Sequence, residues 1–323
     1  MYLFKILKNK VNPIIKLIGF LLILLFLLSN YISAIQAYSF THCKETNTKT
    51  NFKIGFSTLF TGVSLPKPRV IKFPNREYKT IKIVIDKNKY LEGWLLKPES
   101  EYIGTVLIFH GFRSEKSSML DRAYAFLNLG YQVLLVDFMG AGNSYGKQTT
   151  IGYYEAVNVK QAYDYIANKY NEKPIFLCGF SMGAAAIIKA QHDYNLNVKG
   201  LILEAPYGKM IDAVKTRVGK LHYIGMPFSY LMTFWGGALN GFNAFAMNPE
   251  EFIKNITTPT LLLCGGKDPR IPIEESKRIF ENSASDKKEF KIFDNSLHHS
   301  YLEKYPDEWI IIVKNFLENS LHN

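Results

Sequence analysis

A serine set between two glycines is the residue with the clearest chemical meaning in this chain. The motif G-F-S-M-G spans residues 179–183, after the apolar run 175–178 and before an alanine-rich stretch of high helix propensity. Strand, G-x-S-x-G and helix in this order are typical of a nucleophile elbow, where two glycines let strand and helix approach closely. We therefore predict Ser181 as a nucleophile. The Met182 N–H, at the start of the helix, is predicted to bind an oxyanion.

A serine hydroxyl is a poor nucleophile until a base takes its proton, and that base needs a carboxylate to orient it. Asp268 follows the apolar run 260–264, and His298 follows the last predicted strand. Catalytic groups gather at the carboxyl ends of the strands in open parallel sheets. We predict Asp268 as the acid and His298 as the base. Glu204, which follows an earlier strand, is the alternative acid, and His299 is the alternative base.

The segment H-G-F at residues 110–112 also ends a predicted strand. We expect the Phe112 N–H to be the second oxyanion donor and His110 to order this loop. Asp137 opens a glycine-rich loop that lacks the G-x-G-x-x-G spacing of a dinucleotide site, so we assign Asp137 a structural role. Two adjacent histidines without a cysteine or glutamate cluster do not predict a metal site.

Apolar segments of strand length alternate with helical patterns along most of the chain. We predict strands at 80–86, 89–96, 104–111, 131–136, 175–178, 198–204, 260–264 and 290–293. The first two are expected to form a hairpin that turns at 86–89. This alternation predicts an α/β fold, with a mostly parallel central sheet covered by helices on both faces.

One insertion, residues 207–256, is far longer than an ordinary connection between two strands. It is rich in aromatic residues: Tyr223, Phe228, Tyr230, Phe234, Trp235, Phe242 and Phe245. We predict a helical cap that places such side chains above a pocket. The alternative is that they pack onto the domain and bind nothing.

The first residues of the chain have the pattern of a membrane segment. Residues 17–37 are 21 positions without a charge, and basic residues precede them: Lys5, Lys8, Lys10 and Lys16. This length can span a bilayer once. Ala37 could also end a cleaved signal, but we favour an uncleaved anchor. Since lysines stay on the inner side, either interpretation makes the rest of the chain extracytoplasmic, as a single-pass membrane protein or, after cleavage, a secreted one.

We therefore divide the chain into a membrane anchor or signal segment (1–37), a connector (38–78) and a catalytic domain (79–323) that contains the cap at 207–256. The net charge of +11 comes without an arginine cluster or a nucleic-acid motif, so a nucleic-acid partner is not expected. The excess of lysine instead favours a weak attraction to an anionic membrane surface. Three cysteines do not make a disulfide framework, and we interpret all three as structural or incidental.

Four ordered motifs over residues 80–317 together resemble the α/β-hydrolase superfamily: H-G-F at His110, G-F-S-M-G at Ser181, G-G-K-D at Asp268 and L-H-H-S at His298. The loop D-F-M-G-A-G-N-S is similar to that of the serine-aminopeptidase-like and monoacylglycerol-lipase-like branch. It differs at Met139, where arginine is frequent, and Leu297 stands where glycine usually precedes the catalytic histidine. The resemblance implies an α/β-hydrolase fold with a cap after the sixth strand, and hydrolysis of esters, sometimes amides, through an acyl-enzyme without a cofactor.

The expected protein is thus a serine hydrolase that cleaves an acyl ester of a small-molecule or lipid-like substrate. Two alternatives stay open. A serine aminopeptidase would need a carboxylate to hold the substrate amine, and Asp212, Glu250 and Glu251 of the cap are not obviously placed for that. A non-catalytic binding protein built on the same fold is the other alternative.

Overall fold

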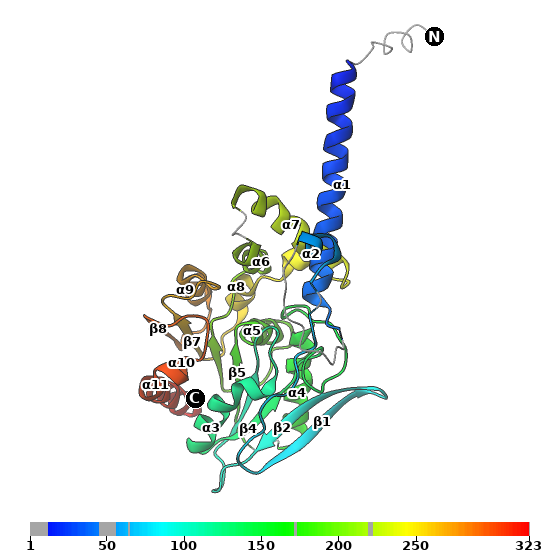
Figure 1. The fold of residues 1–323 in the computed structure, drawn as a ribbon. Helices are drawn as coiled ribbons and strands as arrows, with labels where there is room; N and C mark the ends of the chain where they lie inside the picture. The colour runs from blue at the N-terminus through cyan, green and yellow to red at the C-terminus, as the bar shows by residue number, and fades with distance from the viewer. Residues whose placement is uncertain (1–11, 45–55, 64, 171–172, 219–221, 323) are drawn as a thin grey trace, which may run out of the picture.

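A central sheet of eight strands organises the computed structural model, which describes residues 12–44, 56–63, 65–170, 173–218 and 222–322 (Figure 1). The strand order is β1-β2-β4-β3-β5-β6-β7-β8. Their bounds are β1 (Tyr78–Asp86), β2 (Lys89–Leu96), β3 (Thr105–Phe109), β4 (Gln132–Val136), β5 (Ile175–Phe180), β6 (Gly200–Glu204), β7 (Thr260–Gly265) and β8 (Lys288–Phe293). Strands β3 to β8 pair in parallel, and only β1 and β2 run antiparallel to their neighbours.

The predicted strands all form, with ends that differ by at most two residues. The predicted hairpin at 86–89 is confirmed, because Asp86 pairs with Lys89. The strand predicted over 104–111 ends earlier, at Phe109, since the chain leaves the sheet there to build the loop at residues 110–112.

Helices cover both faces of the sheet, so alternate residues of one strand enter different cores. Leu177 of β5 packs with Val159 and Ile187, whereas its neighbour Cys178 packs with Phe126. The covering elements are η2 (Lys116–Met119), α3 (Leu120–Asn128), α4 (Glu155–Lys169), α5 (Met182–Tyr194), α9 (Ile273–Asn282), α10 (Tyr301–Lys304) and α11 (Pro306–Leu321). Every residue of β3, β4, β6 and β7 is buried, as expected for strands covered on both faces. The predicted α/β architecture is confirmed.

The insertion between β6 and β7 contains several helices. They are α6 (Met210–Val218), α7 (His222–Ala238), η4 (Ala244–Ala246), α8 (Pro249–Phe252) and η5 (Ile253–Asn255). Of the aromatic side chains predicted to face a pocket, Trp235 instead donates its Nε1–H to Asn30 of the first helix at 3.2 Å, and five others divide into two groups. Phe228 and Phe242 line a cavity, whereas Tyr230, Phe234 and Phe245 are exposed. The side chain of Tyr223 lies outside the described residues, and the domain boundaries stay a prediction.

A long helix, α1 (Pro13–Thr41), projects from the body of the molecule (Figure 1). The Asn12 side chain caps it by accepting the Ile14 N–H at 2.9 Å. Its length and composition are sufficient to cross a membrane. Apolar side chains from Ile14 to Leu28 are exposed, and the following turns pack against α7 and α2 (Phe56–Thr61). Three of the predicted flanking lysines, at positions 5, 8 and 10, lie outside the described residues.

Candidate active site

Ser181 joins β5 directly to α5 and has a strained backbone. Its φ of 53° and ψ of −113° lie in a region that side chains other than glycine avoid, at a cost of about 1–3 kcal/mol. The Ser181 N–H donates to the Glu204 carbonyl at 2.7 Å, and the Ser181 carbonyl accepts from the Ala185 N–H at 3.1 Å. These bonds to β6 and α5 hold the serine in the turn predicted for a nucleophile elbow.

The two glycines of the motif allow this turn. A Cβ atom at Gly179 would lie 2.6 Å from the carbonyl carbon of Gly183, and one at Gly183 would lie 2.4 Å from the Phe109 carbonyl oxygen. Real Cβ atoms do not approach backbone atoms so closely. Strand and helix therefore cross at a distance that only glycine permits at both positions.

The structure brings Ser181, His298 and Asp268 together from three separate loops. His298 Nε2 lies 3.0 Å from Ser181 Oγ, and His298 Nδ1 lies 2.6 Å from Asp268 Oδ2. The other carboxylate oxygen of Asp268 accepts the N–H groups of Arg270 and Ile271 at 2.8 and 3.1 Å. Both acid and base are nearly buried, with side chains 1% and 6% exposed. The arrangement has the geometry of a hydroxyl, a base and an orienting carboxylate.

The loops that carry the acid and the base are interlocked. The Lys267 N–H, beside the acid, donates to the Ser296 carbonyl at 3.0 Å, two residues before the base. A Cβ atom at Gly265 would lie 2.6 Å from that same carbonyl oxygen. Because β7 and β8 are parallel neighbours, their carboxyl ends place these loops side by side.

The two alternative residues of the sequence analysis lie elsewhere. Glu204 is fully buried and accepts from Arg122 Nη2 at 2.5 Å and from Trp309 Nε1 at 3.0 Å. Its carboxylate therefore belongs to a buried ion pair between β6, α3 and α11. His299 Nδ1 lies 3.0 Å from the carbonyl oxygen of Ser300 and does not contact the elbow serine.

The predicted oxyanion donors flank the serine. No acceptor among the described residues takes the N–H of Phe112 or of Met182. The loop before Phe112 is held by His110, whose Nε2 accepts from the Phe138 N–H at 3.1 Å and whose Nδ1 donates to the Gly111 carbonyl at 2.8 Å. Burial lowers the pKa of His110, which keeps this ring neutral. His110 thus contacts the loop and not the serine.

Asp137 lies in a buried network that sequence reasoning did not find in full. Lys116 Nζ lies 2.5 Å from Asp137 Oδ2 and 3.0 Å from Glu92 Oε1. The Lys116 N–H and the Asn143 N–H also donate to the Asp137 carboxylate. Lys116 lies within the polar stretch R-S-E-K-S-S at residues 113–118, and nothing local indicates that it is buried.

An open cleft of about 1010 Å³ leads to Ser181 and His298. Arg217 and Arg270 line it, and neither has a carboxylate partner within 4 Å among the described residues. Burial lowers the pKa of Arg217, and the nearby Arg270 charge lowers it further. With Lys72 and Arg113, these two arginines outnumber the carboxylates Asp121 and Glu303 in the cleft lining, which gives this cleft a positive potential. Sequence reasoning missed both, because arginines at a helix end and in a turn resemble ordinary surface residues.

The described part of the chain contains no cluster of three or more His, Cys, Asp or Glu residues that could hold a metal ion. The cysteines Cys43, Cys178 and Cys264 are free and buried.

Comparisons with known proteins agree on one family. A family model described as serine aminopeptidase, S33, matches residues 100–229 and 237–305. The uncharacterized protein YqkD of Bacillus subtilis is 26% identical over 232 residues, which cover 71% of this chain and 75% of that protein. The lysophosphatidylserine lipase ABHD12 of Mus musculus is 26% identical over 216 residues, 60% of this chain and 50% of that protein. The chain thus matches about half the length of the ABHD12 relatives.

Among solved structures, the Pyrococcus furiosus esterase Pf2001 superimposes with a TM-score of 0.64 and 25% sequence identity, covering 78% of this chain and 98% of the esterase. The family match includes the three hydrogen-bonded side chains and begins after α1.

Proposed function

Because the chain belongs to the serine aminopeptidase S33 family, we propose that it is a serine hydrolase that cleaves acyl esters through an acyl-enzyme on Ser181. The observation that carries this proposal is the hydrogen-bonded chain from Ser181 Oγ through His298 to Asp268, at 3.0 and 2.6 Å. It lies at the carboxyl ends of three strands and opens into the cleft.

In the proposed reaction, His298 Nε2 takes the hydroxyl proton while Ser181 Oγ attacks the acyl carbonyl. The Phe112 and Met182 N–H groups bind the oxyanion that forms. His298 then gives its proton to the leaving alcohol, which departs and leaves the acyl-enzyme. A water molecule, deprotonated by His298, attacks the acyl carbonyl, and the acid is released as Ser181 regains its proton. Asp268 holds the imidazole and stabilises its charged form.

The carboxylates of the insertion do not favour a peptide substrate. An aminopeptidase must hold the substrate amine with a carboxylate, but Asp212, Glu250 and Glu251 of the insertion are each paired with a lysine or arginine. The unpaired cations Arg217 and Arg270 would repel an amine and attract an anion.

We infer that the substrate carries one acyl ester and an anionic head group, as a lysophospholipid does. The ABHD12 relatives are named for such a substrate, and the Pf2001 structure is that of an esterase. The positive cleft beside Ser181 supports this class of ligand.

We also propose that α1 is an uncleaved anchor and that the catalytic domain is extracytoplasmic. Gln36 Nε2 donates to the carbonyls of Thr58 and Leu59 at 2.7 and 3.1 Å, and Ala37 is buried. A cut after Ala37 would remove contacts on which α2 depends.

A fluorophosphonate probe tests the nucleophile in the full-length protein. The wild type and Ser118→Ala, which removes another hydroxyl of the same cleft, are expected to take the label, and Ser181→Ala is not. A folded wild type that takes no label would contradict the proposal and favour a non-catalytic binding protein. Turnover of p-nitrophenyl butyrate against an aminoacyl-naphthylamide then separates an esterase from an aminopeptidase.

A further inference from the structure

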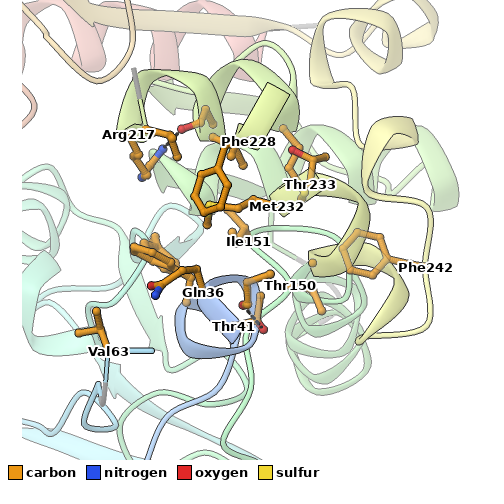
Figure 2. A pocket seen from close by; sticks show the side chains of 18 of the residues that line it. Gln36, Thr41, Val63, Thr150, Ile151, Arg217, Phe228, Met232, Thr233 and Phe242 are labelled. Atoms are coloured by element: carbon orange, nitrogen blue, oxygen red, sulfur yellow. Dashed lines mark hydrogen bonds between the residues drawn. The ribbon is translucent and has the colours of Figure 1, made fainter. Parts of the chain in front are cut away.

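A second cavity, of about 350 Å³, shares part of its lining with the cleft, and Figure 2 shows the side chains around it. Its wall comes from the last turns of α1, from α2 and Val63 after it, from the helices α6 and α7, and from the loops after β3, before α4 and after α7. Apolar side chains dominate this wall, among them Ala37, Phe40, Ile151, Val214, Phe228 and Met232. The volume falls in the range of about 300–1,000 Å³ that is usual for ligand sites.

The polar side chains in this wall have partners within the protein. Gln36 donates to two carbonyls of α2, and Thr41 Oγ1 donates to the Ala37 carbonyl at 2.8 Å. Thr150 Oγ1 donates to Glu155 at 2.7 Å, and Thr233 Oγ1 donates to the Ser229 carbonyl at 2.8 Å. Since these donors are used, the cavity offers an apolar surface that fits an alkyl chain better than a polar group.

The cavity and the catalytic cleft share two residues, Phe112 and Arg217. The Arg217 guanidinium lies 5.9 Å from the centre of the Phe112 ring. Because Phe112 carries a proposed oxyanion donor, an acyl group bound at Ser181 has its carbonyl at the boundary between the polar and the apolar space.

From this arrangement we propose that the 350 Å³ cavity is the acyl-chain site and that the end of the membrane helix α1 forms part of its wall. The proposal rests on the proposed function and gives its substrate a location: the alkyl chain in the apolar cavity, the anionic head in the cleft near Arg217. The anchor is then a component of the binding site. The family match, which begins at residue 100, does not include it.

The expected position of the membrane supports a lipid as the source of the alkyl chain. The exposed part of α1, residues 13–28, carries a single charge at Lys16 and is about 24 Å long, whereas the hydrocarbon core of a bilayer is about 30 Å thick. The body of the protein must therefore sit against the bilayer. Met226, Tyr230 and Phe234, spaced by four on α7, form an exposed apolar stripe. Other residues of α7, Phe228 and Met232, line the cavity, so this helix lies between the cavity and the surface that carries the stripe.

The test fills part of the cavity with a larger side chain on α1. Full-length Ala37→Leu and Ala37→Phe, in detergent micelles, are compared with the wild type on p-nitrophenyl butyrate and p-nitrophenyl dodecanoate. We expect kcat/KM for the dodecanoate to fall about tenfold or more, further for Phe than for Leu and through KM, while the value for the butyrate stays within twofold. Ala34→Leu and Ala34→Phe, one turn earlier on α1 and outside the cavity wall, are the matched controls.

An equal loss for both esters, or no loss for either, would overturn the acyl-chain site. A second measurement does not depend on turnover: calorimetric binding of dodecanoate to Ser181→Ala, with and without Ala37→Phe. If Ala37→Phe abolishes that binding, the site is supported even in a protein that shows no esterase activity, in which case only the proposed function fails. If dodecanoate binds equally to both variants, its alkyl chain binds outside this cavity. Equal melting temperatures of the variants exclude misfolding as the cause.

Discussion

At the scale of single residues, Ser181 occupies a conformation that the rest of the fold must stabilise. The strain of its positive φ is offset by hydrogen bonds to β6 and α5. Gly179 and Gly183 bring strand and helix together around it. The hydroxyl is thereby held 3.0 Å from His298 before any substrate binds, and this pre-organisation is what a nucleophile requires.

We predict that Gly183→Ala destabilises the protein by about 1–3 kcal/mol, because its methyl group would lie 2.4 Å from the Phe109 carbonyl oxygen. Gly236→Ala is the control, since a Cβ atom there has no neighbour within 4 Å and alanine favours a helix. Thermal unfolding of both variants measures the difference. Equal melting temperatures would show that the elbow can relax.

Replacing each of the two buried carboxylates near Ser181 by an amide is predicted to have a different effect: one replacement impairs catalysis and the other impairs stability. Asp268→Asn should lower kcat by about 10⁴ with little change in stability, because the amide cannot stabilise the imidazolium. Glu204→Gln should cost about 3–5 kcal/mol of stability, because it leaves the Arg122 guanidinium buried without its full counter-charge.

Steady-state kinetics and thermal unfolding of the same two variants separate these effects. The reverse pattern, with catalysis lost in the Glu204 variant alone, would make Glu204 the catalytic acid.

At the scale of elements, the start of the insertion is bound to α9 by a buried carboxyl. Glu275 Oε2 accepts the Gly208 N–H at 2.8 Å, and only 5% of this residue is exposed. Burial raises the pKa of Glu275 from 4.5 to about 7. The proton is therefore held more tightly in the folded state than in the unfolded one.

This difference in proton binding makes the free energy of unfolding depend on pH. Between pH 4.5 and about 7 the folded state binds more protons, so the free energy of unfolding decreases as the pH rises, by about 2–3 kcal/mol in total. We predict that Glu275→Gln removes this decrease, whereas Glu274→Gln, on the exposed side of the same turn, leaves it. Denaturant unfolding between pH 4.5 and 8 is the measurement. A wild-type stability that rises over this range would contradict the prediction.

At the scale of the whole molecule, α1 is the segment that we propose connects the protein to a lipid surface. We predict that the full-length protein remains with membranes after carbonate extraction, because residues 13–28 expose an apolar helix surface. The double variant Leu21→Lys/Leu24→Lys should weaken this insertion, at about 2.5–3.5 kcal/mol per lysine near the bilayer centre.

We predict that protease added outside intact cells degrades the domain, since basic residues before a membrane segment favour the inner side. Carbonate release of the wild type, or a fully protected domain, would contradict the predicted anchor or its orientation. The mass of the extracted protein, measured by mass spectrometry, shows whether the protein still contains α1.

Much of the fold was predictable because its signals are local. The strands are continuous apolar runs that end at glycine or polar residues, and their parallel order follows from the helices between them. Ser181, Asp268 and His298 could be selected for the same reason: each follows a recognisable strand. Lys116 and Arg122 could not be identified as buried, because their partners Asp137 and Glu204 lie 21 and 82 residues further along the chain.

The sequence by itself therefore determined the class of fold, the order of its motifs and the residues that could form a nucleophile, a base and an acid, since side-chain chemistry and strand or helix periodicity are properties of neighbouring residues. Only the tertiary structure decided that His298 reaches Ser181, that two arginines face the cleft without a carboxylate within ion-pair distance among the described residues, and that the end of α1 lines an apolar cavity beside it. These features depend on packing between segments far apart in the chain, for which no local pattern gives a signal.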